Sequence, residues 1–378
     1  MGKIIAKIVL TGGPCAGKTT ALSKIEENLI EQGYHVFMVP EGATELINGG
    51  IRPFGNNCLN MFDFEEMIIK YQMLKEKLYE NAIEKLPDNE KCIIIYDRGF
   101  NDAKGFINQE LYDKLLDKLN LNELDLLDNY DMVLHLVTAA DGKEEFYTLD
   151  NNSARSETIE EARKIDKQII NAWSGHSNFK IIDNSTNFED KIKKVINEIN
   201  NLIGSPIKIK KQRKYLIDLK NSDLSYLNND NSTIIKINQT YLKTDNDNYE
   251  KRLRKRTYNG NNTYYFTVQK KINDRESNVV TDKKITEEEY TKILSNNKQN
   301  KSISKTRVSF ICDKQYFKLD IFDNIDLCLL EVEQTLENSK VNLPKFISII
   351  GDVTNDENYS NINIASENKN KVLTKIIN

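Results

Sequence analysis

The feature that most constrains the fold of this chain is a glycine-rich turn between an apolar run and a helical pattern. Residues 12–19 read Gly-Gly-Pro-Cys-Ala-Gly-Lys-Thr, which fits the pattern GxxxxGK[ST]. The apolar run ends at Leu10, and helical periodicity extends from Lys18 to about residue 32. A buried strand that turns directly into a helix is typical of a parallel sheet covered by helices.

The residue types in this turn suit the binding of a phosphate chain. Glycines allow backbone N–H groups to point inward around a phosphate, and the start of the following helix adds partial positive charge. Lys18 is long enough to reach the outer phosphates, and the Thr19 hydroxyl is suited to Mg²⁺. An ordinary strand–turn–helix with incidental glycines is the alternative. We expect Mg²⁺ with ATP or GTP to be bound by Gly12, Gly13, Pro14, Cys15, Ala16, Gly17, Lys18, Thr19 and Thr20.

Further strand and helix patterns alternate through the first half of the chain. Short apolar runs are followed by polar residues, and helical patterns separate them. Such alternation predicts an α/β domain with a parallel sheet and helices on both faces. The apolar runs are residues 34–39, 91–96, 131–137 and 179–182, and the helical patterns are residues 64–84, 109–116, 159–173 and 188–202.

Carboxylates at the ends of two of these strands are candidate site residues. Asp97 ends an apolar run, where a carboxylate can hold Mg²⁺ directly or through water. A turn or helix-cap aspartate is the alternative for Asp97. Glu41 follows the second strand and lies at the sheet edge where ligands bind in such folds. It is a candidate base or substrate contact, with a solvated loop glutamate as the alternative.

Polar residues later in the first half could complete the site. Arg155 and Arg163 follow the fourth strand, and an arginine delivered from there can neutralise charge on a transferred phosphoryl group. An arginine on a helix surface is the alternative for both. Asp183 and Asn184 follow the last strand and could frame the base of a nucleotide.

The composition shifts near residues 204–206, which read Gly-Ser-Pro, so we expect a linker there. This predicts a domain over residues 1–204 and a second domain over residues 205–378. The second half alternates charged and apolar residues, which is typical of a mainly antiparallel sheet with two different faces. The predicted strands are residues 207–219, 232–240, 251–257, 263–271, 307–312, 315–322 and 326–334.

Charged residues in the predicted strands of the second half recur at every other position, so they share faces. Cations on an inward face are costly unless they line a wet cavity that binds anions. A solvated sheet face with balanced salt bridges is the alternative. The predicted lining of a phosphate-ligand tunnel is Lys214, Arg252, Arg254, Arg256, Lys271, Lys305, Arg307, Glu331 and Glu333, with Asp320 nearby.

Composition argues against several other classes of protein. Lys and Arg total 53 against 57 Asp and Glu, so the net charge of -4 makes nucleic-acid coating unlikely. No apolar run approaches the ~20 residues of a membrane span. The five cysteines form no CxxC pair and the three histidines lie far apart, which argues against a zinc site or a disulfide framework. We expect a cytoplasmic protein, with peripheral attachment to membranes as an option.

The first half resembles a known branch of proteins. The glycine-rich turn and the sequences Val39-Pro40-Glu41 and Tyr96-Asp97-Arg98-Gly99, with Asp102, are similar to small-molecule kinases. More narrowly, the chain resembles the AAA-like domain shared by ribosylnicotinamide kinases and the TRPL translocation defect family. That resemblance implies site roles for Trp173 and His176, for which a packed helix end is the alternative. It is carried by residues 135–142, 146–148, 151–152, 172–173, 175–176 and 182–184.

The second half, over about residues 207–366, resembles a CYTH domain, the triphosphate tunnel fold. One departure is informative, because the family's opening ExExK is replaced here by Lys210, Gln212 and Lys214. Loss of two acids removes charge that a catalytic metal needs. We therefore predict a tunnel that binds a phosphorylated ligand and hydrolyses triphosphate poorly. The pairing of the two domains is that of the TRPL family, which implies GTP and phosphoinositide headgroups as ligands.

Three functions remain open at this stage. The first is a nucleotide-dependent enzyme or switch that hydrolyses or transfers the γ-phosphate slowly, while the second domain binds polyphosphate, a nucleotide or an anionic lipid headgroup. The second is a kinase for a nucleoside-like or other small hydroxyl compound. The third is a non-catalytic adaptor that recruits membranes or partners when a nucleotide is bound. No NKxD sequence separates GTP from ATP.

Overall fold

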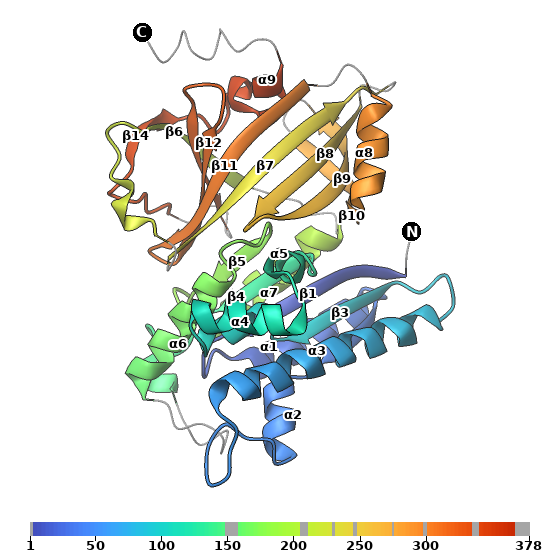
Figure 1. Ribbon diagram of the computed structural model, residues 1–378, viewed down its shortest axis with the longest axis vertical. Helices are drawn as coiled ribbons and strands as arrows, with labels where there is room; N and C mark the ends of the chain where they lie inside the picture. The colour runs from blue at the N-terminus through green and yellow to red at the C-terminus, as the bar shows by residue number, and fades with distance from the viewer. Residues whose placement is uncertain are drawn as a thin grey trace. The chain divides into compact units, whose positions relative to one another are not determined.

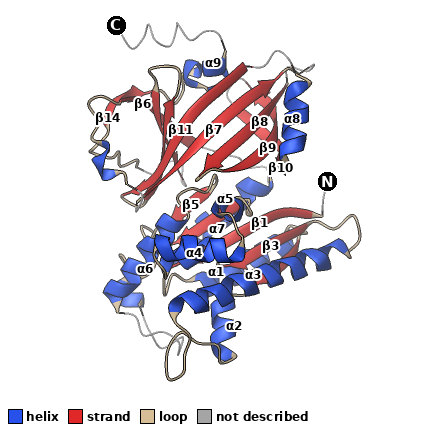
Figure 2. Ribbon diagram, in the orientation of Figure 1, coloured by secondary structure: helices blue, strands red, loops and turns tan. Residues whose placement is uncertain are grey.

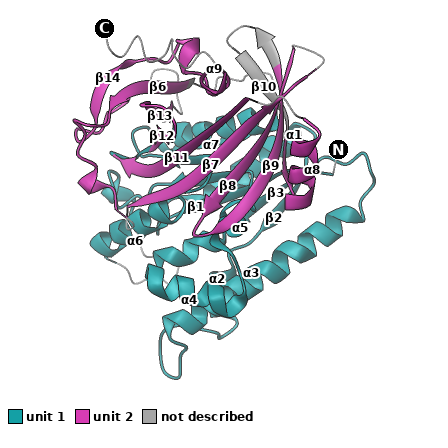
Figure 3. Ribbon diagram, turned by 45° about the horizontal axis from the view of Figure 1, so that its top comes forward, with its two compact units in different colours: residues 1–211, 313–316, 334–340 teal, residues 212–312, 317–333, 341–378 magenta. Residues whose placement is uncertain are grey.

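The structure is a computed structural model, and it describes most of the chain. The described residues are 3–147, 158–204, 211–228, 231–244, 248–273, 276–297, 301–334 and 340–366. The chain divides into two compact units, coloured separately in Figure 3. Unit 1 holds residues 1–211, 313–316 and 334–340, and unit 2 holds residues 212–312, 317–333 and 341–378.

Unit 1 contains a five-stranded sheet in the order β2-β3-β1-β4-β5. Its described strand pairs are all parallel. The residues from Ile8 to Leu10 are fully buried, which explains why β1 reads as an unbroken apolar run. The strands are β1 (Ile4–Gly12), β2 (His35–Val39), β3 (Cys92–Asp97), β4 (Met132–Leu136) and β5 (Phe179–Ile182).

Helices cover both faces of this sheet (Figures 1 and 2). On one face, α1 and α7 pack Ile25 and Val195 against β1, β3 and β4. On the other face, Tyr79 of α3 meets Phe37 of β2 edge to face, with ring centroids 6.3 Å apart. The helices are α1 (Lys18–Glu31), α2 (Gly42–Asn48), α3 (Met61–Glu84), α4 (Gln109–Leu119), α5 (Glu123–Leu127), α6 (Ile159–Ala172) and α7 (Phe188–Ile203), with the 3₁₀ helices η1 (Phe100–Gly105) and η2 (Glu144–Phe146).

Unit 2 contains a nine-stranded sheet in the order β10-β9-β8-β7-β11-β12-β13-β6-β14. The strand pairs whose register is described are antiparallel. The strands are β6 (Lys211–Asp218), β7 (Ser232–Leu242), β8 (Tyr249–Tyr258), β9 (Asn261–Asn273), β10 (Glu276–Ile285), β11 (Lys301–Cys312), β12 (Gln315–Phe322), β13 (Cys328–Gln334) and β14 (Ser348–Asp352).

The two faces of this sheet differ in chemistry. One face carries an apolar core in which Phe310 and Phe317 stack with ring centroids 5.5 Å apart. The opposite face carries the ion-paired side chains of Lys305, Arg307 and Asp320. The helix α9 packs against one end of that face. Short helices complete the unit: α8 (Glu287–Ser295), α9 (Asn361–Ala365), η3 (Leu224–Tyr226) and η4 (Glu357–Tyr359).

The predicted fold class is confirmed: a parallel α/β unit and a mainly antiparallel β unit. Several short elements were not predicted, among them α2, α5, β10 and β14. Their sequences are too brief or too mixed to show a period. Among the described residues, no helix is long and apolar enough to cross a membrane.

Candidate functional site

The turn between β1 and α1 has a backbone that requires glycine at two positions. Gly12 has a φ of 152°, and a Cβ there would lie 2.3 Å from the backbone oxygen of Leu136. Gly17 has a φ of 84°, and a Cβ there would lie 2.5 Å from the ring of Phe188. Side chains are therefore excluded where the loop approaches β4 and α7.

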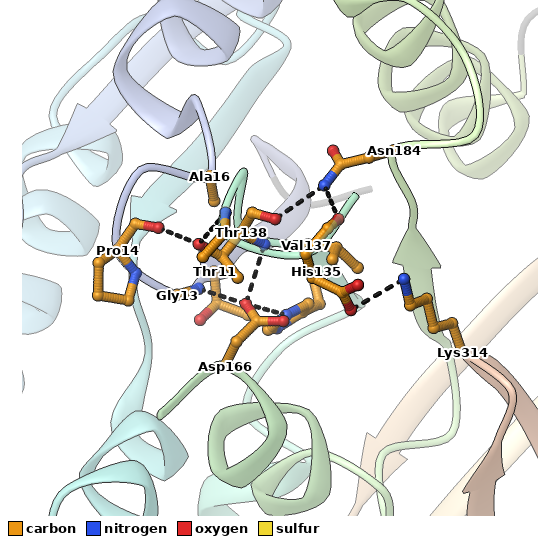
Figure 4. A network of polar contacts seen from close by, with 12 residues as sticks. Thr11, Gly13, Pro14, Ala16, His135, Val137, Thr138, Asp166, Asn184 and Lys314 are labelled. Carbon is orange, nitrogen blue, oxygen red and sulfur yellow. Dashed lines mark hydrogen bonds and ion pairs between the residues drawn. The ribbon is translucent and has the colours of Figure 1, made fainter. Parts of the chain in front are cut away.

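A carboxylate from α6 holds this loop in place (Figure 4). The Oδ1 atom of Asp166 accepts hydrogen bonds from the amides of Gly13 at 2.8 Å and Thr138 at 3.2 Å. It also lies 3.0 Å from Nε2 of the fully buried His135. The Thr138 hydroxyl donates to the carbonyl of Pro14, which adds a second tie to β4.

Burial raises the pKa of Asp166, but the contact with His135 and the two amide hydrogen bonds outweigh it and hold the pKa below its usual value. The residue therefore stays ionised at neutral pH. Sequence reasoning missed Asp166, although a polar residue on the apolar stripe of a helix, three residues before Ile169, was an available signal.

A buried lysine from α7 braces the loop from another side. The ammonium of Lys191 donates to the carbonyl of Val137 at 2.8 Å, to Oδ1 of Asn184 at 2.7 Å and to the carbonyl of Ala16 at 3.4 Å. Burial lowers the pKa of Lys191 to about 8. This lysine was not predicted from the sequence, and it links the glycine-rich turn to the end of β4.

Asp183 and Asn184, which were predicted to contact the base of a nucleotide, form hydrogen bonds with other residues of the chain. The Asn184 amide donates to the carbonyls of Thr138 at 2.8 Å and Asp141 at 2.9 Å. Asp183 accepts from the Ser185 hydroxyl at 2.6 Å. These contacts give both residues a bracing role, and a contact with a nucleotide base stays a prediction.

The predicted carboxylates lie near the predicted lysine. Lys18 is only 8% exposed, and its charge lowers the pKa of both Glu41 and Asp97. Burial is the larger influence on Asp97 and raises the pKa of that carboxyl above its usual value. The Oδ1 atom of Asp97 is buried and has no hydrogen-bond partner within the described ranges.

An orphaned carboxylate oxygen beside a lysine fits a residue that binds a cation with its phosphate ligand. Within the described part of the chain, no group of three or more His, Cys, Asp or Glu residues could hold a metal. Thr19, the other predicted Mg²⁺ contact, is exposed at the start of α1. Mg²⁺ at Thr19 and Asp97 therefore requires phosphate oxygens and water as further ligands, as is usual for this ion.

Arg98, which follows Asp97, has a left-handed backbone with a φ of 73°. Its Nε donates to Glu41, and its Nη1 donates to Asp102 at 3.3 Å. Burial alone would raise the pKa of Glu41, but the charges of Arg98 and Lys18 lower it to about 2. Asp102 also accepts from the Thr11 hydroxyl and from the Gly99 amide, the latter at 2.8 Å.

Glu65 of α3 is a buried carboxyl that sequence reasoning missed. It is 2% exposed, and burial raises its pKa to about 8, with Asp102 adding to the effect and Arg98 opposing it. No hydrogen bond to its carboxyl is found from any residue that the structure describes. Its only sequence signal was an acid on the buried face of the helix that ends at Glu84.

The other predicted site residues lie apart from this cluster or outside the description. Arg155 is not among the described residues. Arg163 donates to Glu144 and to the carbonyl of Ala140, both at 2.6 Å, so it binds the protein itself. Trp173 is fully buried beside Tyr130, and Nε2 of His176 lies 2.9 Å from the Tyr130 carbonyl, an arrangement that favours the packed helix end.

In unit 2, the strand register places the predicted tunnel residues of β8 and β11 on one face, on either side of β7. Arg256 pairs with Ile237, and Ile237 pairs with Lys305 on the other side. Arg252, Arg254 and Arg307 follow at alternate positions of the same strands. The side chain of Lys271 lies outside the description, as does Lys210.

Half of this charged face is a closed network of ion pairs. Asp320 binds Lys305 at 2.5 Å and Arg307 at 2.6 Å. Glu331 binds Arg307 at 3.0 Å and Lys214 at 3.3 Å. Burial raises the pKa of Asp320, but its two cationic partners outweigh this and keep it ionised. Glu333 lies apart from these pairs and binds Lys318 at 3.2 Å.

The arginines of β8 are less completely paired. Arg252 and Arg254 lie 3.7 Å from Glu250 and Asp282 respectively, and the Nε atoms of both arginines have no partner in the described ranges. Burial lowers the pKa of Arg254, and the neighbouring arginines lower it further. Arg256 is 3% exposed. This half of the face therefore has donors available to an anion.

Comparison with known protein families supports the prediction that unit 1 binds a nucleotide. Residues 7–191 match the family model described as "AAA domain", which supports nucleotide binding by this part of the chain. The match covers just under half of the chain. No curated protein matches the sequence.

Solved structures show weak similarity. One is the "hypothetical protein NE1496", with a TM-score of 0.31 and 24% identity over 42% of this chain and 97% of that one. The "inorganic triphosphatase NE1496" has a TM-score of 0.31 and 22% identity, over 42% of this chain and 95% of that one. The PH1819 protein from Pyrococcus horikoshii OT3 has a TM-score of 0.26 and 13% identity, over 34% of this chain and 80% of that one. TM-scores this low carry no argument about the function of this chain.

Replacing Asp166 by Ala should destabilise unit 1 and loosen the loop. The change leaves two buried amides and His135 without their acceptor, which should lower the free energy of unfolding by about 2–5 kcal/mol. Thermal and denaturant unfolding of the full chain would measure this. Asp166→Asn keeps an acceptor oxygen, so its free energy of unfolding should fall by less. Equal decreases in the two variants would contradict the role of Asp166 as the acceptor that holds the loop.

Glu65→Gln should change how stability depends on pH. The folded protein keeps a proton on Glu65 up to a pKa of about 8, whereas an unfolded chain releases it near 4.5. Stability of the natural chain therefore falls as pH rises through this window, and glutamine removes that loss. The advantage of the variant should grow by about 2–4 kcal/mol between about pH 5 and about pH 9.

Unfolding curves across that pH range would check this prediction. Glu66→Gln is the matched control, because hydrogen bonds from Lys118 and Lys70 lower the pKa of Glu66. The free energy of unfolding of the Glu66→Gln control should not rise relative to the natural chain at high pH. A Glu65→Gln advantage that stays constant with pH would show that Glu65 is ionised in the folded protein.

Proposed function

We propose that unit 1 binds a Mg²⁺–nucleoside triphosphate, ATP or GTP, and transfers its γ-phosphate slowly to water or to an acceptor. In the same proposal, unit 2 binds a phosphorylated ligand on its charged face. The braced glycine-rich turn with Lys18 at its end is the observation that carries the proposal. The AAA match over residues 7–191 supports it.

The loop suits a polyphosphate because its shape is fixed before any ligand arrives. Asp166 and Lys191 hold the backbone of the turn, so little conformational entropy is lost when its amides bind phosphate oxygens. Lys18 and the start of α1 supply positive charge to the same place. Preorganised donors of this kind also stabilise charge that develops during phosphoryl transfer.

Thr19 and Asp97 would hold Mg²⁺, which neutralises charge on the outer phosphates when it is bound. The orphaned Oδ1 of Asp97 supports this assignment, since a buried carboxylate oxygen without a partner is otherwise costly. The raised pKa of Asp97 is expected to fall when a cation binds beside it.

A small-molecule kinase is the second candidate, and the Glu41–Arg98 pair favours it. These residues lie at the sheet edge beside Lys18 and Asp97, where an acceptor would meet the γ-phosphate. With a pKa of about 2, Glu41 is a weak proton acceptor at neutral pH. Its role in a kinase would therefore be to orient an acceptor hydroxyl or Arg98, and a general base would be needed elsewhere.

For unit 2, the arginine stripe of β8 supports binding of polyphosphate, a nucleotide or a phosphoinositide headgroup. The resemblance to the TRPL translocation defect family favours GTP for unit 1 and a phosphoinositide for unit 2. Metal-dependent hydrolysis is not expected, because Asp320 and Glu331 are occupied by Lys and Arg partners. Lys210 and Gln212 stand where the related tunnel fold has acids.

Lys18→Ala should weaken the binding of Mg·ATP and Mg·GTP at least ~10-fold, because it removes a charged contact worth roughly 1.5–3 kcal/mol. Isothermal calorimetry on the full chain, with phosphate release measured in parallel, would test this. Lys24→Ala is the matched control, since Lys24 is an exposed residue of the same helix. Unchanged affinity in the Lys18 variant would remove this residue from the site.

Arg254→Ala, made in the Lys18→Ala background, should weaken the binding of tripolyphosphate by about 10-fold, since one charge-assisted hydrogen bond is lost. The Lys18 change prevents unit 1 from contributing to the measured binding of tripolyphosphate. Lys251→Ala is the control, because Lys251 is an exposed residue of β8 that lies on the face opposite to Arg254. Brisk Mg²⁺- or Mn²⁺-dependent phosphate release from tripolyphosphate in this background would contradict the proposed loss of hydrolysis.

A further inference from the structure

The charged face of unit 2 is divided by apolar side chains. The strand register places Ile237 of β7 between Arg256 of β8 and Lys305 of β11. Further along the same strands, Ile235 pairs with Arg307, and both isoleucines are buried. Since neighbouring strands are ~4.8 Å apart, the Cα atoms of Arg256 and Lys305 are separated by roughly 10 Å. The cations of β8 and those of β11 therefore form two separate groups on this face.

The cations of β11 are occupied by acceptors of the protein itself. The side chain of Asp320 is only 1% exposed, and its two oxygens accept from Nε and Nη2 of Arg307, both at 2.6 Å. Asp320 also accepts from the ammonium of Lys305, which donates further to Oδ1 of Asn361 in α9 at 3.2 Å. Paired hydrogen bonds between a guanidinium and a carboxylate are among the stronger polar contacts in proteins. Asp320 thus binds these two cations as an anionic ligand would.

A ligand could displace Asp320 only at a high cost in free energy. A phosphate that took over Lys305 and Arg307 would leave Asp320 as a buried carboxylate without its cations. Breaking a buried ion pair so that one charge is left uncompensated is strongly destabilising. A phosphate would therefore gain little net free energy from the cations of β11.

The arginines of β8 offer donors at a much lower cost. The Nε atoms of Arg252 and Arg254 are buried and have no hydrogen-bond partner in the part of the chain that is described. The ion pairs of these arginines with Glu250 and Asp282 are both 3.7 Å long, which exceeds the length of a hydrogen bond. Arg252 also donates to the neutral side chain of Gln269 at 3.4 Å. A phosphate bound here would satisfy the two orphaned donors and would displace only long contacts.

We propose that Asp320 is a built-in anion that excludes ligand phosphates from Lys305 and Arg307, so that unit 2 binds its ligand on the β8 side of the charged face. This inference rests on the proposed function of unit 2 and narrows its ligand. A third phosphate in a chain gains no charged contact from β11. The ligand therefore presents one phosphate group or a pyrophosphate group, and either a soluble compound or a lipid headgroup can supply it.

The test measures how affinity depends on the length of the phosphate chain. The full chain with Lys18→Ala is used, so that unit 1 does not contribute, and calorimetry without divalent metal ions follows inorganic phosphate, pyrophosphate and tripolyphosphate. Asp320→Asn keeps the shape of the side chain and removes the built-in charge. Asp323→Asn is the matched control, because Asp323 is exposed directly after β12 and its replacement changes the net charge equally.

With Asp320 in place, we expect pyrophosphate and tripolyphosphate to bind with affinities within about 3-fold of each other, because the extra phosphate meets no available cation. Asp320→Asn should raise the affinity for tripolyphosphate at least ~10-fold, since Lys305 is then left with neutral acceptors and can bind the third phosphate. Adding Lys305→Met to Asp320→Asn should abolish this gain, and Asp323→Asn should show none.

The stability of Asp320→Asn provides a second measurement. The variant leaves buried cations short of an anion, so we expect it to unfold at a lower temperature than the chain that keeps Asp320. Tripolyphosphate should raise the unfolding temperature of the variant by more than that of the parent, because the ligand replaces the missing charge. The comparison of pyrophosphate with tripolyphosphate in the parent needs no change at Asp320, so it tests the inference even where the variant does not fold.

Two further probes identify the source of the phosphate group. Phosphatidylcholine vesicles with and without phosphatidic acid present it on a lipid surface, and glycerol 3-phosphate presents it in solution. Vesicle binding that pyrophosphate displaces and that Arg254→Ala weakens would support the inference with a lipid as the ligand. Binding of glycerol 3-phosphate without vesicle binding would support it with a soluble ligand.

Two outcomes would overturn the inference and leave phosphate binding by unit 2 intact. One is tripolyphosphate binding at least ~10-fold tighter than pyrophosphate with Asp320 in place, and the other is a folded Asp320→Asn variant with no gain in affinity. If none of the phosphate probes binds, with or without Asp320, the proposed function of unit 2 is overturned as well.

Discussion

The bond from the Gly13 amide to Asp166 is the interaction on which the arrangement of unit 1 depends. It joins the glycine-rich turn to α6, and the same carboxylate oxygen holds Thr138 at the end of β4. Lys191 adds a tie from α7. Three segments far apart in sequence thus converge on eight residues of loop. A loop held in this way keeps its donors aligned and does not have to be ordered by its ligand.

Much of this site could be predicted, because some residues are placed by the sheet itself. Glu41 and Asp97 end parallel strands, and parallel strands bring their carboxyl ends to one edge. The glycine-rich turn follows a third strand, so its nearness to both residues follows from the same rule. Strand order and packing were not needed for that prediction, only the recognition of three buried strands.

The buried charged residues that lie on helices could not be predicted from the sequence. Asp166, Lys191 and Glu65 each occupy a buried helix face, but a periodic pattern does not say which loop that face will meet. Such pairings depend on how α3, α6 and α7 cross the sheet. The sequence also did not show that Asn184 would be used to hold Thr138 and Asp141, since a strand-end amide serves ligands and loops equally well.

In unit 2, the alternation of charge along the strands predicted that these residues share a face. It did not predict which of the cations would be ion-paired on that face. Asp320 and Glu331 bind the cations of β11, while the Nε atoms of Arg252 and Arg254 in β8 have no partner in the described ranges. The contact between Gly12 and Leu136 in unit 1 limits variation in a different way. Because a side chain at residue 12 would meet a backbone oxygen inside a paired strand, no compensating change elsewhere can make room for it. Residue 12 therefore has to stay glycine as long as β1 pairs with β4 at this position.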